Sequence, residues 1–345
     1  MTADGPATDD DIASCPKVLL HDHLDGGLRP DTLIELADDC GYAGLPSSDP
    51  AELAAWFRGA ADSGSLERYL STFTHTVAVM QTRDALERVA REAVVDLAAD
   101  GVIHAEIRMA PELATAGGLG LDDAIQAMLD GLCAGEQQAA AQGRPVTTGL
   151  IVSAMRHLDR VGEVAEVARD RHGSGVVGFD LAGPEAGFPA SRHAAALARL
   201  RAAGVPLTLH AGEGDGPASV RDALEQGATR LGHGVRVVED PELLSEVVAR
   251  GVCLEVAPTS NLQTGLAPTY AEHPFGELDR AGALVTVNTD NRLMSQTLPS
   301  TELGHLRDAF GLTRDDLLRY ARTAAESAFL DDDARAGLLA RLKQR

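Results

Sequence analysis

Eight short apolar segments alternate with helical patterns along this 345-residue chain, and no other feature of the sequence narrows its possible folds as far. Each segment is rich in aliphatic and β-branched residues and ends in glycine or a polar residue, as strands do. The stretches between them, such as residues 84–100, 124–142, 192–204 and 241–251, have the spacing of amphipathic helices. Eight such alternations predict an α/β fold, a closed (β/α)8 TIM barrel that forms one domain over residues 1–345. The expected strands are residues 17–23, 102–109, 147–154, 175–183, 205–212, 228–234, 251–258 and 283–290.

The first two expected strands are separated by about 80 residues, whereas the others begin roughly 20 to 45 residues apart. This excess predicts a helical insertion over residues 26–82. Connections that leave the carboxyl end of a barrel strand lie on the active-site face, so we expect the insertion to cover the mouth of the barrel as a lid. Residues 313–342 should form C-terminal helices, and residues 1–15 should be a flexible tail.

One stretch of the insertion, SLERYLSTFTHTVAVM, has apolar residues at the spacing of one helical face. Such a helix either buries this stripe in its own core or turns it toward a ligand as part of the lid, and the sequence leaves both readings open. The stripe consists of Leu66, Tyr69, Leu70 and Phe73.

The charge of the chain limits its partners. It has 52 acidic and 30 basic residues, a formal net charge of −22. Phosphate backbones and anionic lipid surfaces repel such a protein, so we expect neither nucleic acid nor membranes as partners. The acidic start lacks the basic and apolar parts of a leader, and no apolar run reaches about 18 residues, which predicts a cytoplasmic location. The cysteines form no C-x-x-C pair and are expected to be reduced.

Histidine and aspartate side chains recur where the expected strands end. His21 and His23 lie two residues apart in one strand, so both point the same way. The carboxyl ends of barrel strands meet on one face, which predicts that these groups converge. Three imidazoles and a carboxylate, without a thiolate and with one open position, are typical of a catalytic zinc site. The alternative is that each of these residues is an ordinary hydrogen-bonded core residue. That explanation would have to apply at four strand ends at once. The other candidates are His210, His233 and Asp290.

The positions of the lysines indicate how many metal ions the site would hold. Two-metal barrel hydrolases commonly bridge their ions with a modified lysine, and this chain has only Lys17 and Lys343. Lys17 opens the first strand, at the far end of the barrel, and Lys343 lies in the tail. We therefore expect one metal ion per chain.

The segment HAGEGDG places Glu213 three residues after His210 on a glycine-rich turn. Glycines let such a turn fold a carboxyl back toward the barrel mouth, so Glu213 is a candidate general acid. The alternative is an ordinary surface glutamate. The glycine spacing does not match a phosphate-binding loop, which also requires a lysine.

Six segments together resemble the motif series of the adenosine deaminase family, within the metal-dependent amidohydrolase superfamily. They occur in order, and the match runs from about residue 16 to residue 330, a span that includes most of the chain. The pair of histidines alone is weak, whereas the ordered set is very specific. The segments are PKVLLHDHLDGGLRPDTL, VVGFDLAGPE, LTLHAGE, RLGHGVRV, LEVAPTSNLQTG and VTVNTDN.

The resemblance implies a role for each matching residue. A single zinc ion would be held by His21, His23, His210 and Asp290. The catalytic groups would be Glu213, which protonates the purine nitrogen N1, His233, which orients the attacking water and assists its deprotonation, and Asp290.

Substrate contacts are implied as well. Gly183 would meet purine N3 through its backbone amide, Asp25 would hold a ribose hydroxyl, and His23 would lie beside the substrate. The expected helix at residues 65–73 resembles the family's apolar gate over the pocket.

One position departs from the family. Paired aspartates usually end strand eight, and the second contacts purine N7, whereas this chain has Asp290 followed by Asn291. An asparagine amide donates a hydrogen bond at any pH, while a carboxyl must be protonated to do so. Recognition of a purine is therefore compatible with Asn291.

The expected reaction is zinc-dependent hydrolytic deamination of adenosine, and of 2′-deoxyadenosine, to inosine or its deoxy counterpart and ammonia, within purine salvage. The expected partners are a small purine nucleoside and water. Because of Asn291, deamination of another 6-aminopurine, aminodeoxyfutalosine or adenine, is the main alternative. A barrel that binds metal or nucleoside without catalysis is a third hypothesis, which the presence of Glu213 and His233 disfavours.

Overall fold

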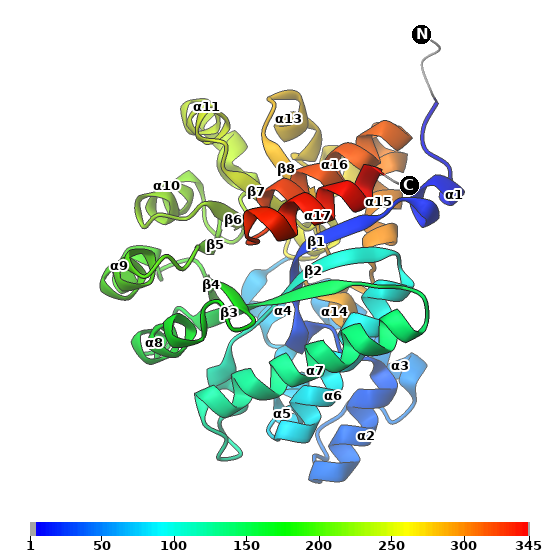
Figure 1. The fold of residues 1–345 in the computed structure, drawn as a ribbon, viewed down its shortest axis with the longest axis vertical. Helices are drawn as coiled ribbons and strands as arrows, with labels where there is room; N and C mark the ends of the chain where they lie inside the picture. Colours follow the sequence, from blue (N-terminus) through cyan, green and yellow to red (C-terminus); the bar gives the residue numbers. More distant parts are fainter. Residues whose placement is uncertain (1–4, 344–345) are drawn as a thin grey trace.

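Eight parallel strands form the centre of the protein in the computed structural model, which describes residues 5–343, and helices surround them (Figure 1). The strands pair in two groups of four, in the orders β1-β2-β3-β4 and β5-β6-β7-β8. Their bounds are β1 Lys17–His23, β2 Val102–Met109, β3 Thr147–Met155, β4 Val176–Ala182, β5 Thr208–Ala211, β6 Arg230–His233, β7 Cys253–Val256 and β8 Leu284–Val287.

Backbone hydrogen bonds join the two groups of strands at both seams. Between β4 and β5, the amide of Phe179 donates to the carbonyl of Pro206 at 3.0 Å. Beyond the end of β8, the amide of His23 donates to the carbonyl of Asp290 at 2.7 Å, and the amide of Asp290 donates to the carbonyl of His21 at 3.0 Å. The predicted (β/α)8 barrel is confirmed, although the last four strands are shorter than expected.

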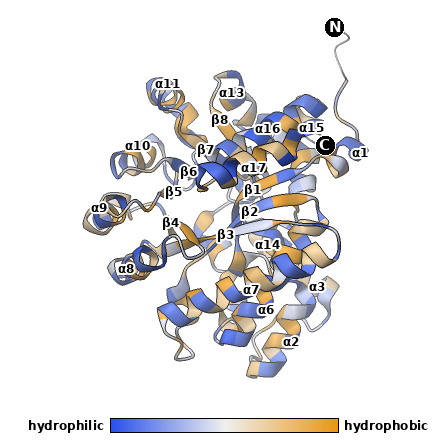
Figure 2. Ribbon diagram, in the orientation of Figure 1, coloured by the Kyte–Doolittle hydropathy of each residue, from blue (hydrophilic) through white to orange (hydrophobic). Residues whose placement is uncertain are grey.

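Helices follow the strands and cover them on the outside. Strands β1 and β2 carry hydrophobic residues, and the helices alternate hydrophobic and hydrophilic stretches, as packing on one face requires (Figure 2). The predicted C-terminal helices α16 (Arg314–Ser327) and α17 (Asp332–Lys343) pack on each other, and α16 contacts β1 and β8. The helices between β1 and α16 that lie outside the insertion are α6 Arg83–Ala99, α7 Leu121–Ala141, α8 Val161–Arg171, α9 Ala194–Ala202, α10 Pro217–Glu225, α11 Pro241–Arg250, α12 Pro258–Gln263, α13 Phe275–Arg280, α14 Arg292–Ser295 and α15 Pro299–Phe310.

The insertion after β1 is helical, as predicted, but its apolar stripe does not lie on one continuous helix. The chain breaks between α4 and α5 because the Ser71 hydroxyl donates to the carbonyl of Arg68, and the Thr72 hydroxyl donates to that of Tyr69, both at 2.7 Å. Such bonds compete with the helical ladder. The expectation of a single helix here is wrong. The helices of the insertion are α2 Pro30–Cys40, α3 Pro50–Ala61, α4 Leu66–Leu70 and α5 Phe73–Val79.

The flexible tail expected over residues 1–15 is wrong for the part that the structure describes; the first four residues lie outside the described range. Residues Asp9–Ser14 form helix α1, which begins with a capping box at Thr8. Ile12 is buried, and the Lys17 ammonium donates to its carbonyl at 2.8 Å. Lys17 therefore anchors this segment at the amino end of β1, far from any metal site.

Between residues 5 and 343, no helix combines the length and hydrophobicity needed to span a membrane. The cysteines are free thiols, as predicted: Cys15, Cys40, Cys133 and Cys253.

Candidate active site

A cavity of about 500 Å³ opens at the carboxyl ends of the strands. Helices α4 and α5 of the insertion form part of its wall, so the insertion lies at the mouth of the barrel. Of the apolar stripe, Tyr69 is only 1% exposed and packs inward while also bordering the cavity. The substrate-contact residues expected from the sequence all line this cavity: His23, Asp25, Leu66, Tyr69, Leu70, Phe73, Gly183 and Asn291.

The four expected metal ligands come together beneath the cavity, with their ligand atoms within 4.8 Å of one another. The Nε2 atoms of His23 and His210 are 3.2 Å apart. Oδ1 of Asp290 lies 3.3 Å from Nε2 of His21 and 3.4 Å from Nε2 of His23. Two ligands of a tetrahedral zinc ion, each about 2.1 Å from it, lie about 3.4 Å apart. Nε2 of His21 is buried and has no hydrogen-bond partner. A metal ion bound to this nitrogen would satisfy it, so the four side chains fit one tetrahedral zinc ion.

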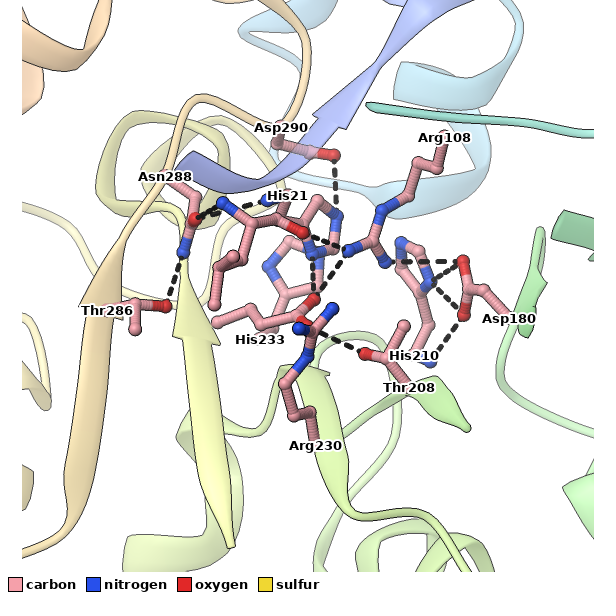
Figure 3. Close-up of polar contacts among 12 residues, drawn as sticks. His21, Arg108, Asp180, Thr208, His210, Arg230, His233, Thr286, Asn288 and Asp290 are labelled. Atoms are coloured by element: carbon pink, nitrogen blue, oxygen red, sulfur yellow. Dashed lines mark hydrogen bonds and ion pairs between the residues drawn. The ribbon is translucent and has the colours of Figure 1, made fainter. Parts of the chain in front are cut away.

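Carboxylates behind two of these histidines fix their orientation. Nδ1 of His21 lies 3.0 Å from Oε2 of Glu255, and Nδ1 of His210 lies 2.9 Å from Oδ2 of Asp180. Arg108 donates to both carboxylates, at 2.6 Å to Glu255 and 3.4 Å to Asp180. Figure 3 shows Arg108 beside Asp180 and His210. A carboxylate on Nδ1 holds the ring hydrogen there and leaves the Nε2 lone pair for a metal ion.

His233 and Asp290 have left-handed backbone conformations, with φ of 61° and 56°. Such conformations cost about 1–3 kcal/mol each in residues other than glycine and cluster at functional sites. Here they occur where β6 and β8 end, and both side chains reach the cavity. Oδ2 of Asp290 also accepts a hydrogen bond from the Ser260 hydroxyl at 2.6 Å, which fixes the carboxylate.

Glu213 lies in the cavity wall, with Oε2 3.6 Å from Nε2 of His233. Burial, together with the negative charges of Asp290 and Glu185, raises the pKa of Glu213 well above its ordinary value. A buried carboxyl of this kind keeps its proton near neutral pH and can deliver it to a substrate.

The loop that bears Glu213 is held by one carboxylate, Glu185. Oε1 of Glu185 accepts the amide of Gly212 at 2.6 Å. Oε2 accepts the amides of Glu213, Gly214 and Asp215 at 3.0, 2.7 and 3.0 Å. Four backbone donors on one buried side chain leave this loop little freedom.

Three polar atoms of residues that line the cavity are buried without a hydrogen-bond partner: Oδ1 of Asp25, Oδ1 of Asn291 and the hydroxyl of Tyr69. Burial raises the pKa of Asp25 to about 7. Asn291 packs on Gly26, where a Cβ would stand 1.9 Å from Oδ1, so this position requires glycine. Gly183 has a φ of 91°, a conformation that favours glycine, and borders the cavity.

Several residues of the site were missed by the sequence reading. A charged residue in the middle of an otherwise apolar strand segment, as in VIHAEIRM, GVVGFDLAG and GVCLEVAP, is a signal that predicts a buried ion pair. The loop and helix residues had no such signal. The missed residues are Arg108, Asp180 and Glu255 in strands, and Glu185, Asn261 and His273 elsewhere.

Residues 16–345 match the sequence profile of the family described as Adenosine deaminase. The chain belongs to the adenosine deaminase family. An adenosine deaminase from Mycolicibacterium vanbaalenii is 51% identical over 346 residues, which cover 97% of this chain and 96% of that protein. Adenosine deaminase 1 from Streptomyces coelicolor is 50% identical over 342 residues, which cover 96% of this chain and 86% of that protein.

Solved structures agree with membership of the adenosine deaminase family. An adenine deaminase from Arthrobacter aurescens superposes with a TM-score of 0.84 at 27% identity, covering 96% of this chain and 99% of that one. An amidohydrolase from Burkholderia ambifaria, with bound Zn, superposes with a TM-score of 0.85 at 28% identity, covering 99% and 95%. The family is metal-dependent, and the cluster of three histidines and an aspartate could hold a metal ion.

Proposed function

We propose that this protein is a zinc-dependent adenosine deaminase, which converts adenosine and 2′-deoxyadenosine to inosine or 2′-deoxyinosine and releases ammonia. The observation that carries the proposal is the position of Glu213. Its buried carboxyl, with a raised pKa, borders the same cavity as the cluster of His21, His23, His210 and Asp290. Relatives named adenosine deaminase, about half identical to this chain, support the choice of substrate.

One zinc ion per chain would be held by His21, His23, His210 and Asp290, whose nitrogen and oxygen atoms suit it better than a softer metal. A zinc ion bound there supplies a hydroxide nucleophile near neutral pH, because it lowers the pKa of water to about 7.

Glu213 supplies the proton that the purine ring requires. When an oxygen adds to C6, the electron pair of the C6–N1 double bond moves onto N1, and the protonated carboxyl of Glu213 delivers its proton there. The proton of the added hydroxyl then passes to the amino group, the bond between C6 and that nitrogen breaks, and ammonia and the C6 carbonyl form. His233 lies 3.6 Å from Glu213 and holds the attacking oxygen in place.

The rest of the cavity recognises the nucleoside. The backbone amide of Gly183 contacts N3, the amide of Asn291 donates to N7, and Asp25 holds a ribose hydroxyl. Leu66, Leu70 and Phe73 cover the base as an apolar gate on helices α4 and α5, which excludes water from the reacting ring.

A substrate panel tests the proposal. Purified protein loaded with zinc is incubated with adenosine, 2′-deoxyadenosine and adenine, and the ultraviolet absorbance change gives kcat/KM for each. We expect the two nucleosides to exceed adenine by at least about 100-fold, since Asp25 has no partner on a free base. Turnover of adenine alone would overturn both the choice of substrate and the role of Asp25.

A further inference from the structure

A chain of buried hydrogen bonds runs from the backbone of α13 to His233. The amide of Phe275 points at Nδ1 of His273 at 3.0 Å, and Nε2 of His273 lies 3.1 Å from Oδ1 of Asn261. Nδ2 of Asn261, on α12, lies 3.0 Å from Nδ1 of His233. All four residues are buried, and Asn261 and His273 have no part in the proposed chemistry.

The first link of this chain has only one possible direction. A backbone N–H can only donate, so Nδ1 of His273 must accept. Burial lowers the pKa of His273 to about 4, which keeps the ring neutral. A neutral imidazole that accepts at Nδ1 carries its hydrogen on Nε2, so His273 donates from Nε2 to Asn261.

The second and third links then follow. The group of Asn261 that faces His273 must be the carbonyl oxygen, since it accepts a hydrogen bond. Its NH2 group therefore faces His233 and donates to Nδ1. His233 accepts at Nδ1, so the hydrogen of its neutral ring lies on Nε2, the atom 3.6 Å from Oε2 of Glu213.

Two of the three proposed metal-ligand histidines, His21 and His210, have the opposite arrangement. Nδ1 of His21 faces the carboxylate of Glu255, and Nδ1 of His210 faces that of Asp180. A carboxylate acceptor holds the hydrogen on Nδ1, whereas an amide donor excludes it. The hydrogen-bond partner of Nδ1 therefore decides what Nε2 can do. In His21 and His210, Nε2 keeps a lone pair that can bind a metal ion, whereas in His233 it carries a hydrogen and cannot.

We propose that His273 and Asn261 are positioning residues that hold His233 in the Nε2–H tautomer, so that His233 presents a hydrogen-bond donor to the cavity. The donor steadies the oxygen that attacks C6. This refines the expectation that His233 assists in deprotonating water, because in the resting protein Nε2 already carries a hydrogen. Only this catalytic consequence rests on the proposed function, since the tautomer is a property of the protein without substrate.

Nitrogen-15 NMR of the zinc-loaded protein labelled in its histidines tests the proposal. A protonated and an unprotonated ring nitrogen resonate at well separated frequencies, and the His233→Gln variant, which lacks the His233 signals, assigns them. We expect Nε2 of His233 to be protonated and Nδ1 to be unprotonated at pH 8. The reverse pattern in the unmodified protein would overturn the proposal, and the variant serves only to assign the signals.

The Asn261→Asp variant tests the role of the chain. A carboxylate still accepts from His273 but can only accept from His233, so the hydrogen of His233 should move to Nδ1. We expect kcat to fall about 100-fold or more with little change in KM, at unchanged zinc content. The matched control is His305→Gln, a histidine stacked on Tyr270, which should change neither the His233 signals nor kcat.

The outcomes separate the two proposals. A moved hydrogen with unchanged kcat would overturn the catalytic role of the tautomer. A protein with the expected His233 signals and no activity on adenosine would refute the proposed substrate and leave the tautomer established.

Discussion

Arg108 and Glu255 form a fully buried ion pair, with Nη2 of the guanidinium 2.6 Å from Oε2 of the carboxylate. The same Oε2 faces Nδ1 of His21, and the other arm of Arg108 reaches the carboxylate behind His210. One guanidinium on β2 is thereby connected to two of the proposed metal ligands, His21 on β1 and His210 on β5. Rigidity of the metal site therefore depends on a residue that contacts neither the ion nor the substrate.

Arg108→Met should destabilise the protein and weaken metal binding together. Removing one partner of a buried ion pair costs about 3–5 kcal/mol, and loss of support behind metal ligands costs about 10- to 100-fold in affinity. Urea unfolding and competition with a zinc chelator measure the two effects. The control is Arg250→Met, which removes an exposed ion pair with Glu246 and should cost no more than about 1 kcal/mol. Equal losses in both variants would argue against the connection described here.

Glu213→Gln should keep its zinc and lose about 100- to 10,000-fold in kcat, because an amide cannot deliver the proton to N1. Elemental analysis and steady-state kinetics on the same preparation test this. If the variant loses its zinc, Glu213 is a metal ligand and not the acid.

Asn291→Asp should add a new dependence on pH to kcat/KM. In the proposed complex the amide donates to N7 at any pH, whereas the new carboxyl donates only when protonated, so activity should fall as the pH rises through its pKa. The profile of the unmodified protein should lack this fall. An adenosine analogue with carbon in place of N7 is the control, because the two proteins should then have the same profile. If the variant and the unmodified protein also have the same pH profile with adenosine, Asn291 does not contact N7.

Glu185→Gln should loosen the loop that carries Glu213. The four backbone amides now point at one carboxylate, and a side-chain NH2 group would face some of these donors in the variant. We expect the amides of residues 212–215 to exchange with deuterium at least about 10-fold faster, since local opening becomes easier. Glu163→Gln, on the surface beside Arg160, is the control and should leave exchange in this loop unchanged.

Glu302 should make stability depend on pH. It is buried on α15, where it accepts from the Thr259 amide and the Thr297 hydroxyl, and burial raises its pKa from 4.5 to about 7. Between these values the folded protein keeps the proton and the unfolded chain releases it. The unfolded state then binds fewer protons, so this group's contribution to stability falls as the pH rises through the window, by about 3 kcal/mol.

Glu302→Gln should remove this contribution because the amide does not titrate. Urea unfolding of both proteins at pH 5 and pH 7.5 gives the difference in their pH dependence, and Glu277→Gln, an exposed residue, is the control. A difference below about 1 kcal/mol would contradict the raised pKa.

The sequence predicted the barrel and the metal cluster because both repeat a local rule. Each strand is an apolar run of residues, and each proposed ligand lies where such a run ends. His21, His210 and Asp290 could therefore be assigned to the site without knowledge of the packing. Glu185 and His273 could not, since their roles depend on which loops meet in space. Helix α1 was missed because its acidic residues resemble a solvated tail, while Ile12 and the Lys17 bonds that anchor it are tertiary contacts.

The seam between β1 and β8 has a consequence for the synthesis of this protein. Its backbone hydrogen bonds join His21 and His23 to Asp290, so the first and last strands of the barrel meet at three of the proposed metal ligands. A nascent chain therefore cannot complete its ligand set until residue 290 has left the ribosome. Products that terminate before residue 290 should accordingly be inert fragments, with no partially active enzyme among them.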